Sequence, residues 1–114
     1  MSGVAYEHTL FSGSVTGNGN TQATPAIVRW VKEGIFFVDI TAIGAGTTLT
    51  IELQTHNTLA DKWHRVAIWD GFTTTGIDEG FISDGLGDKI SVLYSFSGGT
   101  TTATFSVTAQ FKEF

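Results

Sequence analysis

The sequence contains no cysteine and only one proline, and charged residues make up only 15% of its 114 residues. The lack of cysteine excludes a disulfide-stapled scaffold, and the scarcity of proline excludes collagen-like and proline-rich chains. A low charge content combined with 41% hydrophobic residues argues against intrinsic disorder. We therefore expect a folded chain whose stability comes from packing.

Basic residues and long apolar runs are also scarce. Six Lys and Arg stand against eleven Asp and Glu, so the formal net charge is -5. Binding to a phosphate backbone requires clustered cations, so we expect no nucleic-acid partner. The apolar run 34–38 ends at Asp39, far short of the ~20 residues of a membrane helix, and we expect no membrane span. The first residues lack the basic and apolar segments of a secretory signal, so we also expect no export.

Catalytic and metal-binding patterns are missing as well. A Ser or Thr nucleophile would need one of His8, His56 and His64 as its base, yet no nucleophile-elbow motif or paired-ligand spacing is present. The acidic stretch 78–88 offers oxygen ligands for calcium, but its spacing does not match an EF-hand loop, and solvated loop acids are the commoner reading. The sequence predicts no catalytic residue, no metal site and no cofactor.

Alternating apolar and polar residues predict β-strands along most of the chain. The residues Thr101 to Phe111 alternate with period two, and so do Ile90 to Phe96, with a glycine-containing turn at 97–100 between them. This pattern predicts a β-hairpin. A second hairpin is predicted from Ile35 to Thr55 around the turn 44–46, with Asp39 and Glu52 on its two strands and Glu52 pointing to solvent.

The remaining predicted strands complete a sheet protein. They are Tyr6 to Ser12 continued by Ser14 to Thr16, Ala26 to Val31, Lys62 to Trp69, and a short one at Gly80 to Ser83. Seven or eight strands predict an all-β fold, a single antiparallel β-sandwich, with a jelly roll favoured over a closed barrel. The whole of 1–114 is predicted to be one domain. Residues 1–25 read as an N-terminal arm followed by a polar, mobile loop.

Two segments of the chain resemble each other. Val38 to Leu53 and Val92 to Val107 align at an offset of 54, which places Gly44 against Gly98. Convergence of two Thr-rich strand pairs and an internal duplication both explain the match. A duplication would place two like halves face to face.

Several strands carry apolar residues on both faces, more than one thin sandwich can bury. Phe36, Val38, Ile40 and Ala42 share one face, while Ile35, Phe37 and Ile43 share the other. Trp63 and Trp69 have the same parity with Val66 and Ile68 opposite, which requires either a second apolar surface or a bulge that resets the parity. The residues expected at a subunit or capsid interface are Tyr6, Leu10, Phe11, Trp63, Trp69 and Phe72. The alternative role for Trp30, Trp63 or Trp69 is stacking on sugars.

The order of these elements resembles small virion proteins of tailed bacteriophages. The resemblance is carried by the Gly/Asn/Thr lead-in 17–25, the segment 40–51, the Trp strand from Lys62, and the final segment 94–112. It implies a β-sandwich or jelly-roll module, and for some members a decoration or cement protein on the outside of the capsid. The stretch 78–88 departs from the pattern.

On this resemblance we expect a non-enzymatic virion protein that is made in the host cytoplasm and located on the outer capsid surface. Its expected partners are itself, as a dimer or trimer, and the major capsid protein. A neck or tail component of the same virion and a carbohydrate-binding module are the alternatives.

Overall fold

The computed structural model describes residues 5–28, 31–84 and 88–113, without the side chains of 5–6, 31–33, 77–84 and 113. Strands account for most of this part, and no helix in it could cross a bilayer. The strands are β1 (Ala5–Val15), β2 (Gly19–Asn20), β3 (Ala26–Ile27), β4 (Val31–Ile43), β5 (Thr48–Asn57), β6 (Lys62–Phe72), β7 (Gly76–Asp84), β8 (Lys89–Ser97) and β9 (Ala103–Glu113).

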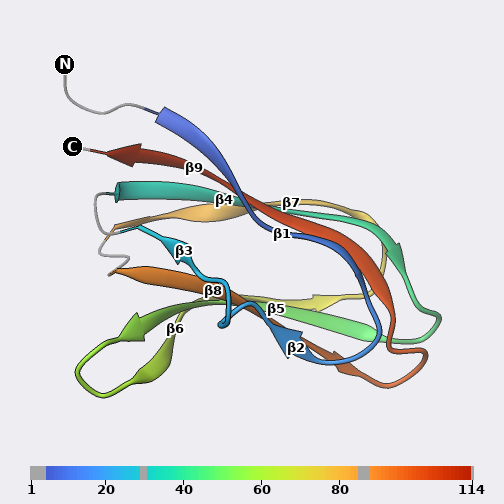
Figure 1. Ribbon diagram of the computed structural model, residues 1–114. Helices are drawn as coiled ribbons and strands as arrows, with labels where there is room; N and C mark the ends of the chain where they lie inside the picture. The colour runs from blue at the N-terminus through green and yellow to red at the C-terminus, as the bar shows by residue number, and fades with distance from the viewer. Residues whose placement is uncertain (1–4, 29–30, 85–87, 114) are drawn as a thin grey trace.

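The strands form two antiparallel sheets that face each other (Figure 1). Sheet A has the order β1-β9-β4-β7, and sheet B has the order β2-β8-β5-β6 with β3 also pairing with β8. Because β2 and β3 both pair with β8, they act as one interrupted strand. The first strand then pairs with the last, the second with the next to last, and so on inward. This nested pairing is a jelly roll, so the predicted fold class is confirmed.

Both predicted hairpins are wrong, although their strands exist. β4 pairs with β7 and β9 in sheet A, whereas β5 pairs with β6 and β8 in sheet B. β8 and β9 are likewise in different sheets. Alternation determines which residues form a strand and which face is apolar, but not which strand lies alongside. The glycine turns 44–46 and 97–100 therefore connect the two sheets.

The two similar segments do face each other. Val38 lies opposite Val107 in sheet A, and Leu53 lies opposite Val92 in sheet B, so each segment pairs with the other along both of its strands. The turns also bind each other, because the Thr100 amide donates to the Ala45 carbonyl at 2.9 Å. This arrangement is the one that two like halves would make.

The core lies between the sheets and is built from their inward-facing residues. Sheet A contributes Phe36, which meets Phe111 edge to face at 5.9 Å between ring centroids. Each fully buried side chain of this size contributes about 1.5–3 kcal/mol to stability. The buried apolar residues are Val28, Phe36, Val38, Ile40, Leu49, Ile51, Leu53, Trp69, Ile90, Val92, Ala103, Phe105, Val107, Ala109 and Phe111.

Bulges account for part of the apparent excess of apolar faces. In β4 the register shifts between Ile40 and Ala42, so Ala42 is exposed and Ile43 turns inward, the reverse of the alternation-based prediction. In β6 the register shifts at Val66, which places Trp63 on the outer face and Trp69 in the core. The bulge weighed from the sequence therefore explains the tryptophan parity.

Candidate functional site

The described residues contain no group of three or more His, Asp or Glu side chains that could hold a metal ion. His8, His56 and His64 lie on β1, β5 and β6. In the acidic stretch 78–88, side chains 78–84 and residues 85–87 lie outside the described residues. The candidate sites are therefore surfaces.

The residues expected at an interface do not form one patch. Leu10 lies at a bulge of the edge strand β1, and Phe11 beside it packs against Tyr94 and Phe105, with ring centroids 5.4 and 4.8 Å away. Tyr6 lies opposite Phe111 in the backbone register, and its side chain is outside the described residues, as is Trp30. Leu10 and Phe11 are both half-buried, and of the two Leu10 lines a groove on the surface.

The other predicted interface residues lie on β6. Trp69 is 7% exposed in the core, and Phe72 is half-buried against it. Trp63 is half-buried on the outer face of sheet B and contacts the ring of His56 in a tilted arrangement, with the ring centroids 4.9 Å apart. A sugar-stacking role would therefore fall to Trp63 among the described tryptophans.

A groove runs along the open edge of the sandwich between β1 and the segment 24–27. It has a volume of about 350 Å³, and its apolar wall includes Leu10, Pro25 and Ile27, the last 40% exposed. The preceding segment is tied to sheet B, because the Thr21 amide donates to the Val92 carbonyl at 2.9 Å and the Asn18 carboxamide accepts from the Phe96 amide at 2.8 Å. The polar lead-in thus holds one wall of the groove in place.

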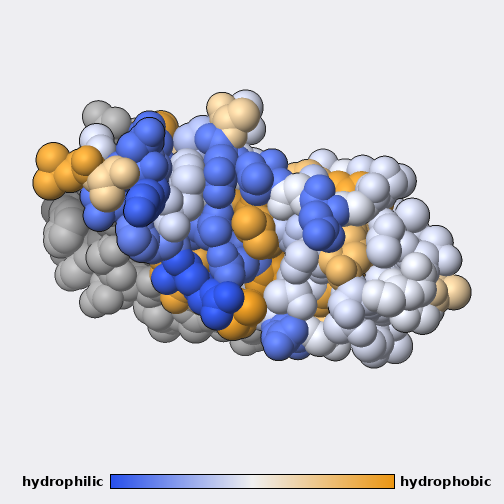
Figure 2. All heavy atoms as spheres, turned by 90° about the horizontal axis from the view of Figure 1, so that it is seen from below, coloured by the Kyte–Doolittle hydropathy of each residue, from blue (hydrophilic) through white to orange (hydrophobic). Residues whose placement is uncertain are grey.

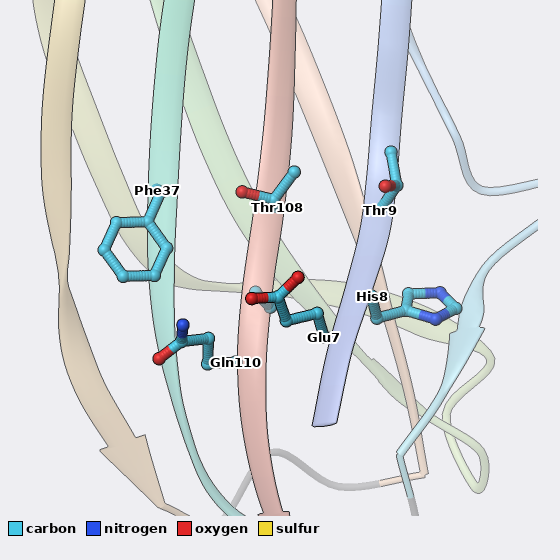
Figure 3. Close-up of a pocket in the computed structure, with 7 residues that line it drawn as sticks. Glu7, His8, Thr9, Phe37, Thr108 and Gln110 are labelled. Carbon is cyan, nitrogen blue, oxygen red and sulfur yellow. The ribbon is translucent and has the colours of Figure 1, made fainter. Parts of the chain in front are cut away.

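The outer face of sheet A carries a second hollow, a pocket of about 210 Å³ (Figure 3). Strand register builds it from two neighbouring rows: Thr9, Thr108 and Phe37 lie across β1, β9 and β4, and Glu7 and Gln110 lie in the next row. Figure 3 shows Glu7 and Gln110 beside Phe37 and Thr108, whereas the His8 ring points away from them. Phe37 is half-buried and forms an aromatic wall.

The residues of this pocket are far apart in the sequence, which gave no sign of it. The alternation did place Phe37 on the face opposite the core, but the neighbours of Phe37 come from strands far away in the chain. Only the β1-β9-β4 register brings Glu7 and Gln110 beside it.

The outer face of sheet B carries a partly buried polar network around Glu52. Glu52 points outward as predicted, yet it is 9% exposed rather than solvated. Arg65 Nε donates to its carboxylate at 2.6 Å, and Gln54 Nε2 donates to the other oxygen at 2.7 Å. Gln22 in turn donates to the Gln54 oxygen at 2.9 Å, which ties the lead-in segment to the sheet. Figure 2 shows hydrophilic residues forming a broad band over this face.

Replacing Arg65 with methionine should lower the free energy of unfolding by about 1–2 kcal/mol. The Glu52 carboxylate would keep its bond from Gln54 but lose its charged donor while remaining mostly buried. Arg65→Lys, which keeps the charge, should cost less. Urea unfolding followed by circular dichroism measures both, and equal stability of Arg65→Met and the parent chain would contradict the assignment.

No protein-family model matches the chain, and no curated protein sequence matches it significantly. Solved structures match it at low identity. The VP2 subviral particle of infectious bursal disease virus gives a TM-score of 0.61 at 13% identity over 97% of this chain and 33% of VP2. The SPBc2 prophage-derived protein YomS gives 0.55 at 13% identity over 99% and 96%. Eiger TNF from S. frugiperda gives 0.52 at 12% identity over 100% and 94%.

Each of these three solved structures shares the fold of this chain. At 12–13% identity the similarity shows the fold alone. The chain spans about a third of the length of VP2, whereas it matches YomS and Eiger TNF from end to end.

Proposed function

We propose that the protein is a non-enzymatic structural component of a virion, and specifically a decoration protein that binds the outside of a bacteriophage capsid. The observation that carries the proposal is the end-to-end match to the prophage-derived YomS, 99% of one chain on 96% of the other. The match of the same fold to a VP2 subviral particle adds support. A jelly roll without a described metal cluster and with two broad outer faces suits a protein whose work is interface burial.

Self-association belongs to the same proposal. The groove beside Leu10 and Ile27 is an apolar surface at an open sandwich edge, where a dimer or trimer contact would bury it. Of the residues predicted at an interface, Leu10 lines this groove, whereas Trp63 lies on the outer face of sheet B and would belong to a separate contact. Binding the assembled shell would then stabilise it by mass action, by about 2.7 kcal/mol per site at a hundred times the Kd.

Cryo-electron microscopy of particles from the organism that encodes the chain tests the proposal. We expect copies of the jelly roll on the outer surface of the head, and we expect heads that lack the protein to release DNA at a lower temperature. Density in the neck or tail would support the alternative virion location instead. Particles without the protein would contradict a virion role altogether.

Self-association is tested separately, on the purified chain. Light scattering of the purified chain should give an oligomer, and Leu10→Asp should give a monomer with an unchanged circular dichroism spectrum. If the parent chain were monomeric at all concentrations, the proposed self-association would be wrong. Capsid binding would still be tested by the microscopy.

A further inference from the structure

The pocket around Phe37 combines an aromatic wall with hydrogen-bonding groups that have no partner among the described residues. No hydrogen bond or ion pair of the described part of the chain involves the side chains of Glu7, Thr9, Thr108 or Gln110. Glu7 and Gln110 are exposed, and each offers at least one oxygen as an acceptor. These groups are open to a ligand.

The charge on this face is negative. Glu7 lies in the row beside Phe37, and Asp39 lies two residues further along the same face of β4. The described cation nearest along β9 is Lys112, which already has an interaction of its own. The whole chain carries a net charge of -5, which attracts cations over longer distances. An anionic ligand is therefore disfavoured.

We propose that this pocket receives an arginine side chain of the partner surface, with its guanidinium stacked on Phe37 and bonded to Glu7. A guanidinium is planar, carries five N–H donors and no acceptor, and stacks on aromatic faces. The pocket offers the complement: one aromatic face from β4, one carboxylate from β1, and the side-chain oxygens of Thr108 and Gln110 on β9 between them. A lysine ammonium is a point charge that uses fewer of these acceptors.

The proposal rests on the proposed function, because it names the chemistry by which the capsid partner would be held. Neighbouring strands lie about 4.8 Å apart, so β1 and β4 are about 9.6 Å apart with β9 between them. The side chains of Glu7 and Gln110 lie beside Phe37 and Thr108 in that interval, where a guanidinium on the Phe37 ring could reach the Glu7 carboxylate (Figure 3). Sheet A is a rigid platform here, since β9 pairs on both sides. The backbone of the site is preformed, so binding has to order only its exposed side chains.

NMR titration of the isotope-labelled full chain tests the proposal with the peptide acetyl-Gly-Arg-Gly-amide. We expect the largest shifts at the Gln110 side-chain amide and at the Thr9 and Thr108 backbone amides. The same peptide with citrulline, which is nearly isosteric and neutral, should bind at least tenfold more weakly, and the lysine peptide should bind more weakly than the arginine peptide.

The decisive variant is Glu7→Gln, which should weaken arginine binding about tenfold at low salt, the loss of one charge-assisted hydrogen bond. Asp61→Asn is the matched control, because it removes one charge from a 93% exposed side chain in the turn between β5 and β6 and should change binding less than twofold. The spectrum also reports whether each variant folds. If Glu7→Gln does not fold, the comparison of arginine and citrulline peptides on the parent chain still tests whether the pocket binds a charged guanidinium.

Equal binding of arginine and citrulline, or of arginine and lysine, would overturn the assignment. So would shifts that map away from the pocket, or equal effects of the two variants. Stronger shifts from methyl glucoside at the same amides would identify a sugar site instead. These outcomes leave the microscopy result untouched, so failure of the pocket assignment is distinct from failure of the virion role.

Discussion

Replacing Gly99 with alanine is expected to destabilise the fold by about 3–5 kcal/mol. Gly99 has a φ of 56°, in the left-handed region, and a Cβ there would overlap backbone atoms of Ala45 and Gly46 and lie 2.5 Å from the Thr47 nitrogen. Backbone atoms cannot rotate away as a side chain would. The turn 97–100 would have to separate from the turn 44–46, breaking the Thr100 to Ala45 hydrogen bond. Urea unfolding followed by circular dichroism measures the loss.

Gly44→Ala isolates the steric part of this effect. Gly44 lacks a positive φ, but its Cβ would overlap the Thr100 carbonyl oxygen and lie 2.9 Å from the Thr102 hydroxyl. Gly71→Ala is the opposite control, because Gly71 has a φ of 85° and open space around it, so only conformational strain of about 1–2 kcal/mol should appear. If Gly44→Ala proved no more destabilising than Gly71→Ala, the two turns would not be in contact.

These turns also show how much of the fold the sequence could predict. Alternation located the strands, and the resemblance of 38–53 to 92–107 indicated two units that face each other. The hairpin assignment failed because glycine turns of this length suit either a hairpin or a crossing between sheets. The contact between the two turns favours the crossing between sheets, and this contact joins residues far apart in the chain.

The surfaces could be predicted only in part, for the same reason. Leu10 was expected at an interface and does lie on a groove, but Trp69 points into the core because of one extra residue at Val66. The pattern placed Glu52 on the outer face, yet its burial depends on Arg65 and on Gln54, which is itself bound by Gln22. The alternation of apolar and polar residues along a strand predicts which face of the sheet a side chain lies on. The residues beside it depend on strand register and on bulges, which the alternation does not reveal.

Phe36 and Phe37 allow the clearest test of what each face of sheet A does. Phe36 is fully buried against Phe111, so Phe36→Ala should lower the free energy of unfolding by about 3–5 kcal/mol through lost transfer energy and a cavity. Phe37 is half-buried on the outer face. Phe37→Ala should cost only about 1 kcal/mol, because water can replace the lost contacts there.

The two variants should also separate stability from binding. Phe37→Ala should abolish the arginine-dependent shifts at Gln110 while lowering the free energy of unfolding by only about 1 kcal/mol, because its ring lines the pocket rather than the core. The difference in stability between the two variants should be the same at low and high protein concentration. A Phe37→Ala loss that grows with concentration would mean that a second copy covers this face, since only bound partners make stability depend on concentration. The outer face of sheet A would then be a self-association surface, and the excess apolar residues of β4 would be buried by the neighbouring copy.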